Sequence, residues 1–158
     1  MLPRRCFRKA EKGFTLAELV MVAAVLVILA AVTLPVAKFT ARRTKEMELH
    51  AALREMRNAV DEYKRYSDLG LIPVDLGTEG YPADLDVLVD GVEVVGQVDK
   101  KLKLLRRIPI DPMTGEHEWG MRSYQDEPDA TSWGGENVYD VYSLSKGVGL
   151  NGVPYREW

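Results

Sequence analysis

The feature that most constrains this chain is a long uncharged stretch near its start. Residues 19–37 read LVMVAAVLVILAAVTLPVA, nineteen positions without Asp, Glu, Lys or Arg, and only Thr33 and Pro35 break the apolar run. The hydrocarbon core of a bilayer is about 30 Å thick and is crossed by roughly 20 apolar helical residues. The run therefore predicts a membrane-spanning helix, which the average composition of 46% hydrophobic and 28% charged residues conceals.

A short basic segment precedes the apolar run. Residues 1–13 carry five Lys or Arg and one Glu, a net +4, whereas the whole chain of 158 residues has a formal net charge of −3, which leaves −7 for residues 14–158. The chain as a whole lacks the basic excess typical of nucleic-acid-binding proteins. Its single cysteine, Cys6, lies in the basic segment, and without a second Cys it supports no disulfide, redox or metal motif within the chain.

Three interpretations compete for residues 1–40. A cleaved secretory signal has an apolar region of about 7 to 15 residues followed by an A-x-A-like site, but this run is longer and has no A-x-A. A simple signal anchor leaves Glu18 unexplained, because an unpaired carboxylate at membrane depth costs several kcal/mol. Cleavage between Gly13 and Phe14 would instead free an amine with a reference pKa of about 8. That amine can neutralise Glu18 of a neighbouring subunit and so set the register of a filament.

The sequence GFTLAEL at residues 13–19, after a basic leader and before the apolar run, resembles the class III signal of type IV pilins and type II secretion pseudopilins. The resemblance implies that a membrane aspartyl prepilin peptidase cleaves after Gly13 and methylates the amine of Phe14. It also implies that Glu18 is the assembly glutamate and that Pro35 loosens or kinks the helix. Four basic residues at 38–45 balance those of the leader, so the resemblance, and not the positive-inside rule, places the leader in the cytoplasm.

The helix is predicted to continue beyond the apolar run, because after Pro35 no Gly or Pro occurs before Gly70. An unbroken helix over residues 14–67 would be about 80 Å long, so its front half needs lipid or other subunits and its back half needs the remaining chain. The back half carries apolar residues at spacings of 4, 3, 4 and 3, which predict a core-facing stripe: Leu49, Leu53, Met56, Val60 and Tyr63.

Residues 69–158 are typical of a small α+β head. Apolar alternation and turn residues predict the following elements: helical turns at 84–89 and 99–106, strands at 119–124, 138–143 and 153–158, and a surface loop at 125–136. Three motifs in this head resemble the major pseudopilin of type II secretion systems: Gly80-Tyr81-Pro82, the IPIDP sequence at 108–112 and the VYDVYS sequence at 138–143.

The head departs from that family at its end, where a calcium-binding loop is usual. Residues 144–152 contain no carboxylate and place Lys146 in the middle of the loop, whereas calcium takes six to eight oxygen ligands, usually with several carboxylates. Asp126, Asp129 and Asp140 could still contribute from elsewhere, but calcium is disfavoured. We expect no cofactor or metal, and a head closed by packing and by a tight Asn151-Gly152 turn.

Other chemical motifs are weak. Gly147, Gly149 and Gly152 satisfy G-x-G-x-x-G, but Pro154 follows and leaves no room for the helix that a dinucleotide site requires. His50 and His117 are expected on the surface, with no zinc site or catalytic triad. The aromatic residues of the head are expected in its core, although Trp133 in its Ser-Trp-Gly context is a candidate subunit contact.

These observations predict a type IV pilin-like α+β fold with a cleaved leader at 1–13, an assembly helix at 14–37, an amphipathic stalk at 38–68 and a head at 69–158. By resemblance, the chain is a non-enzymatic pseudopilus subunit in the bacterial inner membrane with its head in the periplasm. Its implied partners are copies of itself, minor pseudopilins, the prepilin peptidase, membrane lipid and an inner-membrane platform with a cytoplasmic ATPase. The alternatives are a type IV pilin for adhesion, motility or DNA uptake, and a signal-anchored periplasmic binding or enzymatic domain.

Overall fold

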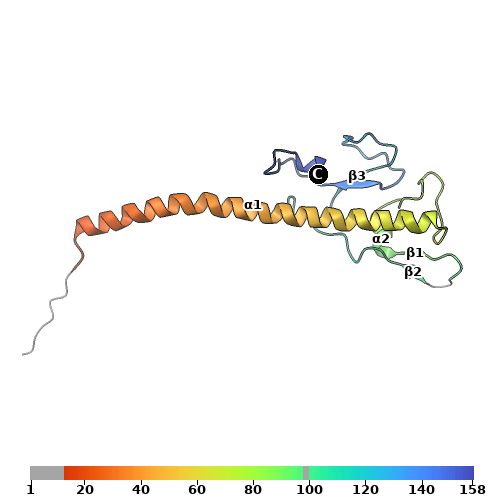
Figure 1. Ribbon diagram of the computed structural model, residues 1–158, viewed down its shortest axis with the longest axis horizontal. Coiled ribbons are helices and arrows are strands. Elements are labelled where there is room, and N and C mark those ends of the chain that lie inside the picture. The colour runs from red at the N-terminus through yellow and green to blue at the C-terminus, as the bar shows by residue number, and fades with distance from the viewer. Residues whose placement is uncertain (1–12, 98–99) are drawn as a thin grey trace, which may run out of the picture. The chain divides into compact units, whose positions relative to one another are not determined.

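A computed structural model of the chain describes residues 13–97 and 100–158. It contains one long helix, one short helix, two small antiparallel sheets and a final 3-10 turn (Figure 1). The chain divides into two compact units, Met1–Ala41 and Arg42–Trp158, and the division falls inside the long helix. The second part of that helix therefore belongs with the head, and we describe each unit by itself.

The long helix α1 covers Leu16–Asp68, 53 residues. It begins at a Thr cap, because the Thr15 hydroxyl accepts a hydrogen bond of 3.2 Å from the Glu18 backbone N–H. It ends where Gly70 adopts a φ of 67°, as predicted, and Leu71 N–H donates to the Tyr66 carbonyl at 3.0 Å. Pro35 lies within the helix, but the side chains of residues 32–35 lie outside the described part, so the kink there stays a prediction.

The core of the head forms around the predicted stripe of α1. All five stripe residues are buried, which confirms the interpretation of their spacing. Apolar residues from every later part of the chain pack against them, including Ile72, Leu85, Leu88, Leu105, Trp119, Val138, Val141 and Tyr155.

The strands form two separate ladders. Strand β1 (Val92–Glu93) pairs antiparallel with β2 (Lys101–Leu102), and β3 (Gly120–Arg122) pairs antiparallel with β4 (Asp140–Tyr142). In Figure 1 the β1–β2 ladder and strand β3 lie on opposite sides of α1. The α+β, pilin-like fold is thus confirmed, as are the strands expected within 119–124 and 138–143. The short helix α2 (Asp86–Asp90) confirms the helical turn expected at 84–89.

Two expected elements are wrong. The helical turn expected at 99–106 begins at Asp99, outside the described residues, and continues as strand β2 and an irregular segment. There the alternation of Lys101, Leu102, Lys103 and Leu104 has the period of a strand. The expected strand at 153–158 is instead a single bridge from Pro154 to Val148, followed by the 3-10 helix η1 (Tyr155–Glu157), which turns the Tyr155 ring into the core.

Candidate assembly segment and head

The predicted cleavage site lies in open backbone just before α1. Gly13 and Phe14 precede the helix, and the Phe14 side chain is 75% exposed. Beyond its two neighbours in the chain, no described residue places an atom within 4 Å of the position that a Cβ on Gly13 would occupy. A peptidase would therefore meet an exposed, non-helical substrate here, while the roles of Gly13 and Phe14 in cleavage and methylation stay predictions.

Glu18 occupies the first turn of α1. Its backbone N–H is capped by Thr15, and its negative charge is favoured at a helix N-terminus. Among the described residues, its carboxylate makes no ion pair and no side-chain hydrogen bond. The structure thus leaves this carboxylate available to a group from outside the chain.

The helix surface that follows Glu18 is apolar and uncovered. Its large side chains are at least half exposed from Leu16 to Leu29, and none of the most apolar window of α1 is buried in its own chain. Within the described residues, α1 is the one helix long and apolar enough to cross a membrane. Together with its place near the start of the chain, this is compatible with membrane anchoring.

In the head, the three pseudopilin-like motifs come together. The Ser143 hydroxyl donates a hydrogen bond of 2.6 Å to the Asp111 carboxylate, which joins the second motif to the third. The Val138 N–H donates to the Pro82 carbonyl at 2.7 Å, and the Tyr81 ring meets the Tyr139 ring edge-on at 5.3 Å, which join the first motif to the third. The sequence showed these motifs only as separate segments.

Asp111 is fully buried, and its carboxylate is satisfied on both oxygens. Besides the hydrogen bond from the Ser143 hydroxyl, the carboxylate accepts one of 2.7 Å from the Met113 N–H. The backbone carbonyl of Asp111 accepts another, of 2.7 Å, from the Gly115 N–H. A buried carboxylate is tolerated only with such partners. Asp111 therefore holds the turn at 111–116 against the β4 end.

The C-terminal loop is fastened to α1 by Glu46, which sequence reasoning missed. The Glu46 carboxylate accepts hydrogen bonds of 2.9 Å from both the Leu150 N–H and the Tyr155 hydroxyl, and the Arg42 guanidinium lies 3.4 Å away. The Tyr155 hydroxyl, with a smaller effect from the Glu46 carboxylate, raises the pKa of Arg42. Glu46 lies three residues before Leu49, so its position on the buried stripe was the available signal.

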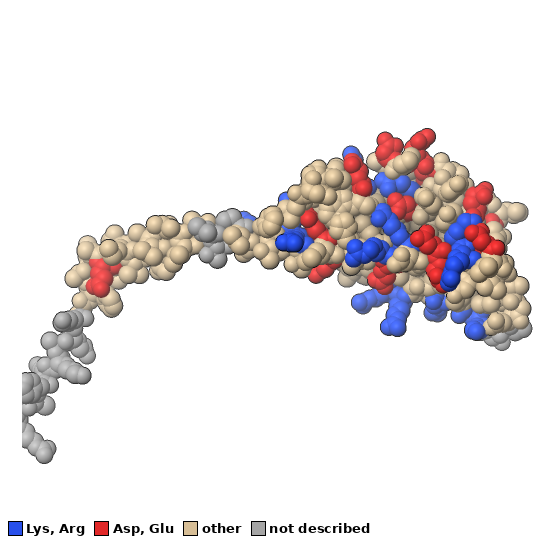
Figure 2. Space-filling view, viewed as in Figure 1, with Lys and Arg blue, Asp and Glu red and all other residues tan. Residues whose placement is uncertain are grey.

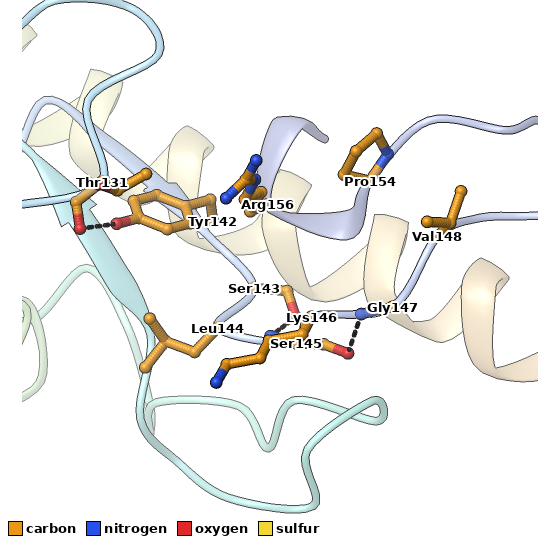
Figure 3. A pocket seen from close by; sticks show the side chains of 10 residues that line it. All are labelled: Thr131, Tyr142, Ser143, Leu144, Ser145, Lys146, Gly147, Val148, Pro154 and Arg156. Carbon is orange, nitrogen blue, oxygen red and sulfur yellow. Dashed lines mark hydrogen bonds between the residues drawn. The ribbon is translucent and has the colours of Figure 1, made fainter.

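The expected Asn151-Gly152 turn is present in this loop. Gly149 and Val153 are joined by a hydrogen bond of 2.7 Å, Gly152 has a φ of 83°, and the Asn151 side chain accepts the Val153 N–H at 3.0 Å. The loop also lines an open cavity of about 460 Å³ (Figure 3), where Lys146 and Arg156 contribute cationic side chains. Cations in place of carboxylates make this cavity a poor calcium site.

Two of the three aspartates that remained candidates for calcium contact other groups of the head. Asp140 bridges the Arg57 guanidinium at 2.7 Å and that of Arg122 at 3.3 Å. Asp126 accepts the Ser123 and Gly134 N–H groups, and these hydrogen bonds lower the pKa of its carboxyl. Asp129 is exposed in the loop. Within the described ranges, no three His, Cys, Asp or Glu side chains gather as a metal site, and the expectation of a calcium-independent head stays a prediction.

The two histidines and Trp133 make contacts within the head. His50 and His117 are both exposed, as expected; the His50 ring stacks on Trp158 at 4.2 Å, and His117 Nδ1 is hydrogen-bonded to the Ile108 carbonyl at 3.0 Å. Trp133 is half-buried against the core, and its indole N–H donates to the Asn137 carbonyl at 2.8 Å.

Comparison with known proteins adds one finding. A protein-family model described as the prokaryotic N-terminal methylation motif matches residues 8–34, a span that includes Gly13, Phe14 and Glu18. Searches of curated proteins and of solved structures gave no match. The motif does not distinguish a pseudopilus subunit from a pilus subunit. The chain therefore carries the prokaryotic N-terminal methylation motif, the class III signal that fits type IV pilin-like proteins processed as prepilins.

Proposed function

We propose that this chain is a structural subunit of the pseudopilus of a type II protein secretion system. Prepilin peptidase cleaves it after Gly13 and methylates Phe14, and the mature chain leaves the inner membrane to join a periplasmic filament. The observation that carries this proposal is the methylation motif at 8–34, placed on a helix whose apolar surface its own chain leaves uncovered.

Assembly follows from the physical chemistry of that helix. In lipid, helices associate through close packing and polar contacts and not through the hydrophobic effect. The apolar residues from Leu16 to Leu29 supply the packing surface. The Glu18 carboxylate, with no partner among the described residues, pairs with the Phe14 amine of a neighbouring subunit. Removing one partner of a buried ion pair costs about 3–5 kcal/mol, so this contact sets the register of the polymer.

The head stays in the periplasm and does no chemistry. Its minor pseudopilin partners extend the filament, while an inner-membrane platform and its cytoplasmic ATPase drive growth that moves folded substrates outward. A pseudopilin head is favoured over a disulfide-stapled pilin head for two reasons. The chain has no cysteine after Cys6, and its Asp111–Ser143 and Pro82–Val138 contacts join the three motifs typical of major pseudopilins.

A type IV pilin is the second candidate, because the same methylation motif fits both kinds of subunit. Deletion of the chain separates the two. The pseudopilin proposal expects the secreted proteins to accumulate in the periplasm, with cell-surface pili, adhesion, twitching and DNA uptake unchanged. Loss of surface pili with normal secretion would assign the chain to a pilus. A signal-anchored periplasmic domain is the third candidate, and it predicts that neither filaments nor secretion depend on Glu18.

A further inference from the structure

Two surfaces of opposite charge lie on the head. The first, the basic strip, spans residues 100–107 and contains five cations and no acid: Lys100, Lys101, Lys103, Arg106 and Arg107. The second, the acidic loop, spans residues 125–136 and contains four acids and no cation: Asp126, Glu127, Asp129 and Glu136. Figure 2 shows Lys and Arg gathered along the edge where β1 and β2 lie, and Asp and Glu at the opposite edge.

The fold fixes the outward direction of the basic strip. Leu105 is buried in the core, Leu102 and Leu104 pack against it, and the Leu104 and Leu105 N–H groups both donate to the Leu88 carbonyl at 3.0 and 2.9 Å. With the leucines turned inward, all five cations of the strip are exposed. The strip is therefore a preorganised surface.

The acidic loop is anchored in a similar way. The Asp126 carboxylate holds the Ser123 and Gly134 N–H groups at 2.7 and 3.1 Å, and the Arg122 guanidinium donates to the Ala130 carbonyl at 3.1 Å. These contacts fix the backbone and leave the side chains of Glu127, Asp129 and Glu136 exposed.

Neither surface forms an ion pair within the described chain, although Arg122 lies close enough to Asp126 to help lower its pKa and lines a hollow with Asp129. None of the five cations and none of the four acids belongs to an ion pair among residues 13–97 and 100–158. Glu93 faces Lys101 in the β1–β2 register, and Glu55 lines a hollow with Arg106 and Arg107, so two acids reduce the positive charge of the strip without cancelling it. Because the strip and the loop lie on opposite sides of α1, one chain cannot join them.

We propose that the basic strip of one subunit docks on the acidic loop of a second copy of this chain. The two surfaces are complementary in charge, and each subunit offers one of each, so the contact repeats from subunit to subunit along a polymer. The hollow beside Arg106 and Arg107, about 360 Å³, gives a carboxylate of the loop a place to insert. This inference rests on the proposed polymerisation and adds to it a contact between heads that orients each new subunit.

Site-directed cross-linking tests the contact in cells that process the full chain. In a Cys6→Ser background, the pair Arg107→Cys and Asp129→Cys supplies one thiol on each surface. A short thiol cross-linker is preferable to a disulfide, which needs Cα atoms about 4.4–6.8 Å apart. We expect a ladder of dimers, trimers and longer oligomers. The matched control carries Lys146→Cys in place of Arg107→Cys, and we expect at least tenfold less ladder.

The outcomes separate this inference from the proposed function. If the parent chain forms no polymer, the proposed function fails, and the head contact fails with it. If the parent polymerises but the Arg107 and Asp129 thiols give no ladder, or no more than the control, only the head contact is overturned.

Charge exchange provides an independent test with no added thiol. The basic reversal Arg106→Glu with Arg107→Glu, and the acid reversal Glu127→Lys with Asp129→Lys, should each lower polymer yield at least tenfold, and their combination should restore most of it. All four residues are exposed, so the melting temperature of the head should not change. Reversals without effect, or no recovery in the combination, would overturn the contact. So would a basic reversal that polymerises normally but loses binding to vesicles of anionic phospholipid, because the strip would then serve the membrane.

Discussion

The two parts of α1 form one continuous helix but differ in whether the rest of the chain covers their apolar side chains. From Arg42 to Asp68 the helix is amphipathic, and its stripe is buried under the rest of the head. From Leu19 to Leu29 the helix is apolar on all sides, and its large side chains stay exposed. A helix that is hydrophobic all round must be buried by something else, either lipid or other chains. The second part therefore stabilises the folded head, and we infer that the first part associates with lipid or with other subunits.

The largest expected effect concerns Glu18. We expect Glu18→Ala to abolish polymer formation while leaving the chain in the membrane, because the amine of the neighbouring subunit loses its partner at membrane depth. Sedimentation of sheared filaments measures the effect. The matched control is Glu48→Ala, which removes an exposed helix carboxylate in the second part; equal assembly of the Glu18 and Glu48 variants would contradict the assigned role.

Buried and exposed apolar positions of α1 should respond differently to truncation. Met56 is fully buried, so Met56→Ala should lower the free energy of unfolding of the head by about 2–5 kcal/mol. Leu26 is 60% exposed, and Leu26→Ala should leave head stability unchanged and weaken assembly instead. Thermal unfolding followed by near-UV circular dichroism of the full chain in detergent measures the first effect. A drop of similar size for both variants would mean that the parts are not independent.

Glu46 tests how the head closes without a metal. Glu46→Ala removes a carboxylate that accepts two hydrogen bonds and an ion pair, and we expect a loss of about 2–3 kcal/mol in stability. Limited proteolysis at the loop 144–152 should accelerate in the variant. Calcium should neither stabilise the parent head nor rescue the variant; a rise in melting temperature with calcium would show that the loop is closed by an ion.

The smallest predicted effect is on pH dependence. Hydrogen bonds from the Ser123 and Gly134 N–H groups hold the pKa of Asp126 below its ordinary value of about 3.8. Because the folded-state pKa is lowered, the charged carboxylate stabilises the head fully above the unfolded-state pKa. This stability is lost as the pH falls through the folded-state pKa. Asp126→Asn should lower the stability near pH 7, where the charged carboxylate contributes fully, and should flatten the fall in stability below about pH 4. An NMR titration of the Asp126 carboxyl that finds an ordinary or raised pKa would contradict this reading.

Much of this molecule could be predicted because its strongest signals are periodic or local. The uncharged run, the stripe from Leu49 to Tyr63 and the Gly70 stop each depend on residues close in sequence. The 3-10 turn at Tyr155 was missed because it depends on the core that the Tyr155 ring enters, and the strand β2 because its alternation is short.

The long-range polar contacts could not be predicted from the sequence. Glu46 meets Leu150 across 104 positions, and Asp111 meets Ser143 across 32. No local pattern specifies such a distant partner, because the pairing follows from how the head folds over α1. Glu18 is the reverse case: its pattern is plain in the sequence, while its proposed partner belongs to another chain.

The most direct test of the account is the mass of the mature chain extracted from the membrane of cells that produce it, followed by fragmentation of its N-terminal peptide. We expect a chain that begins at Phe14 and carries one added methyl group on its amine. A chain that still begins at Met1, or one cut after Ala37, would contradict the assembly role of the first part of α1.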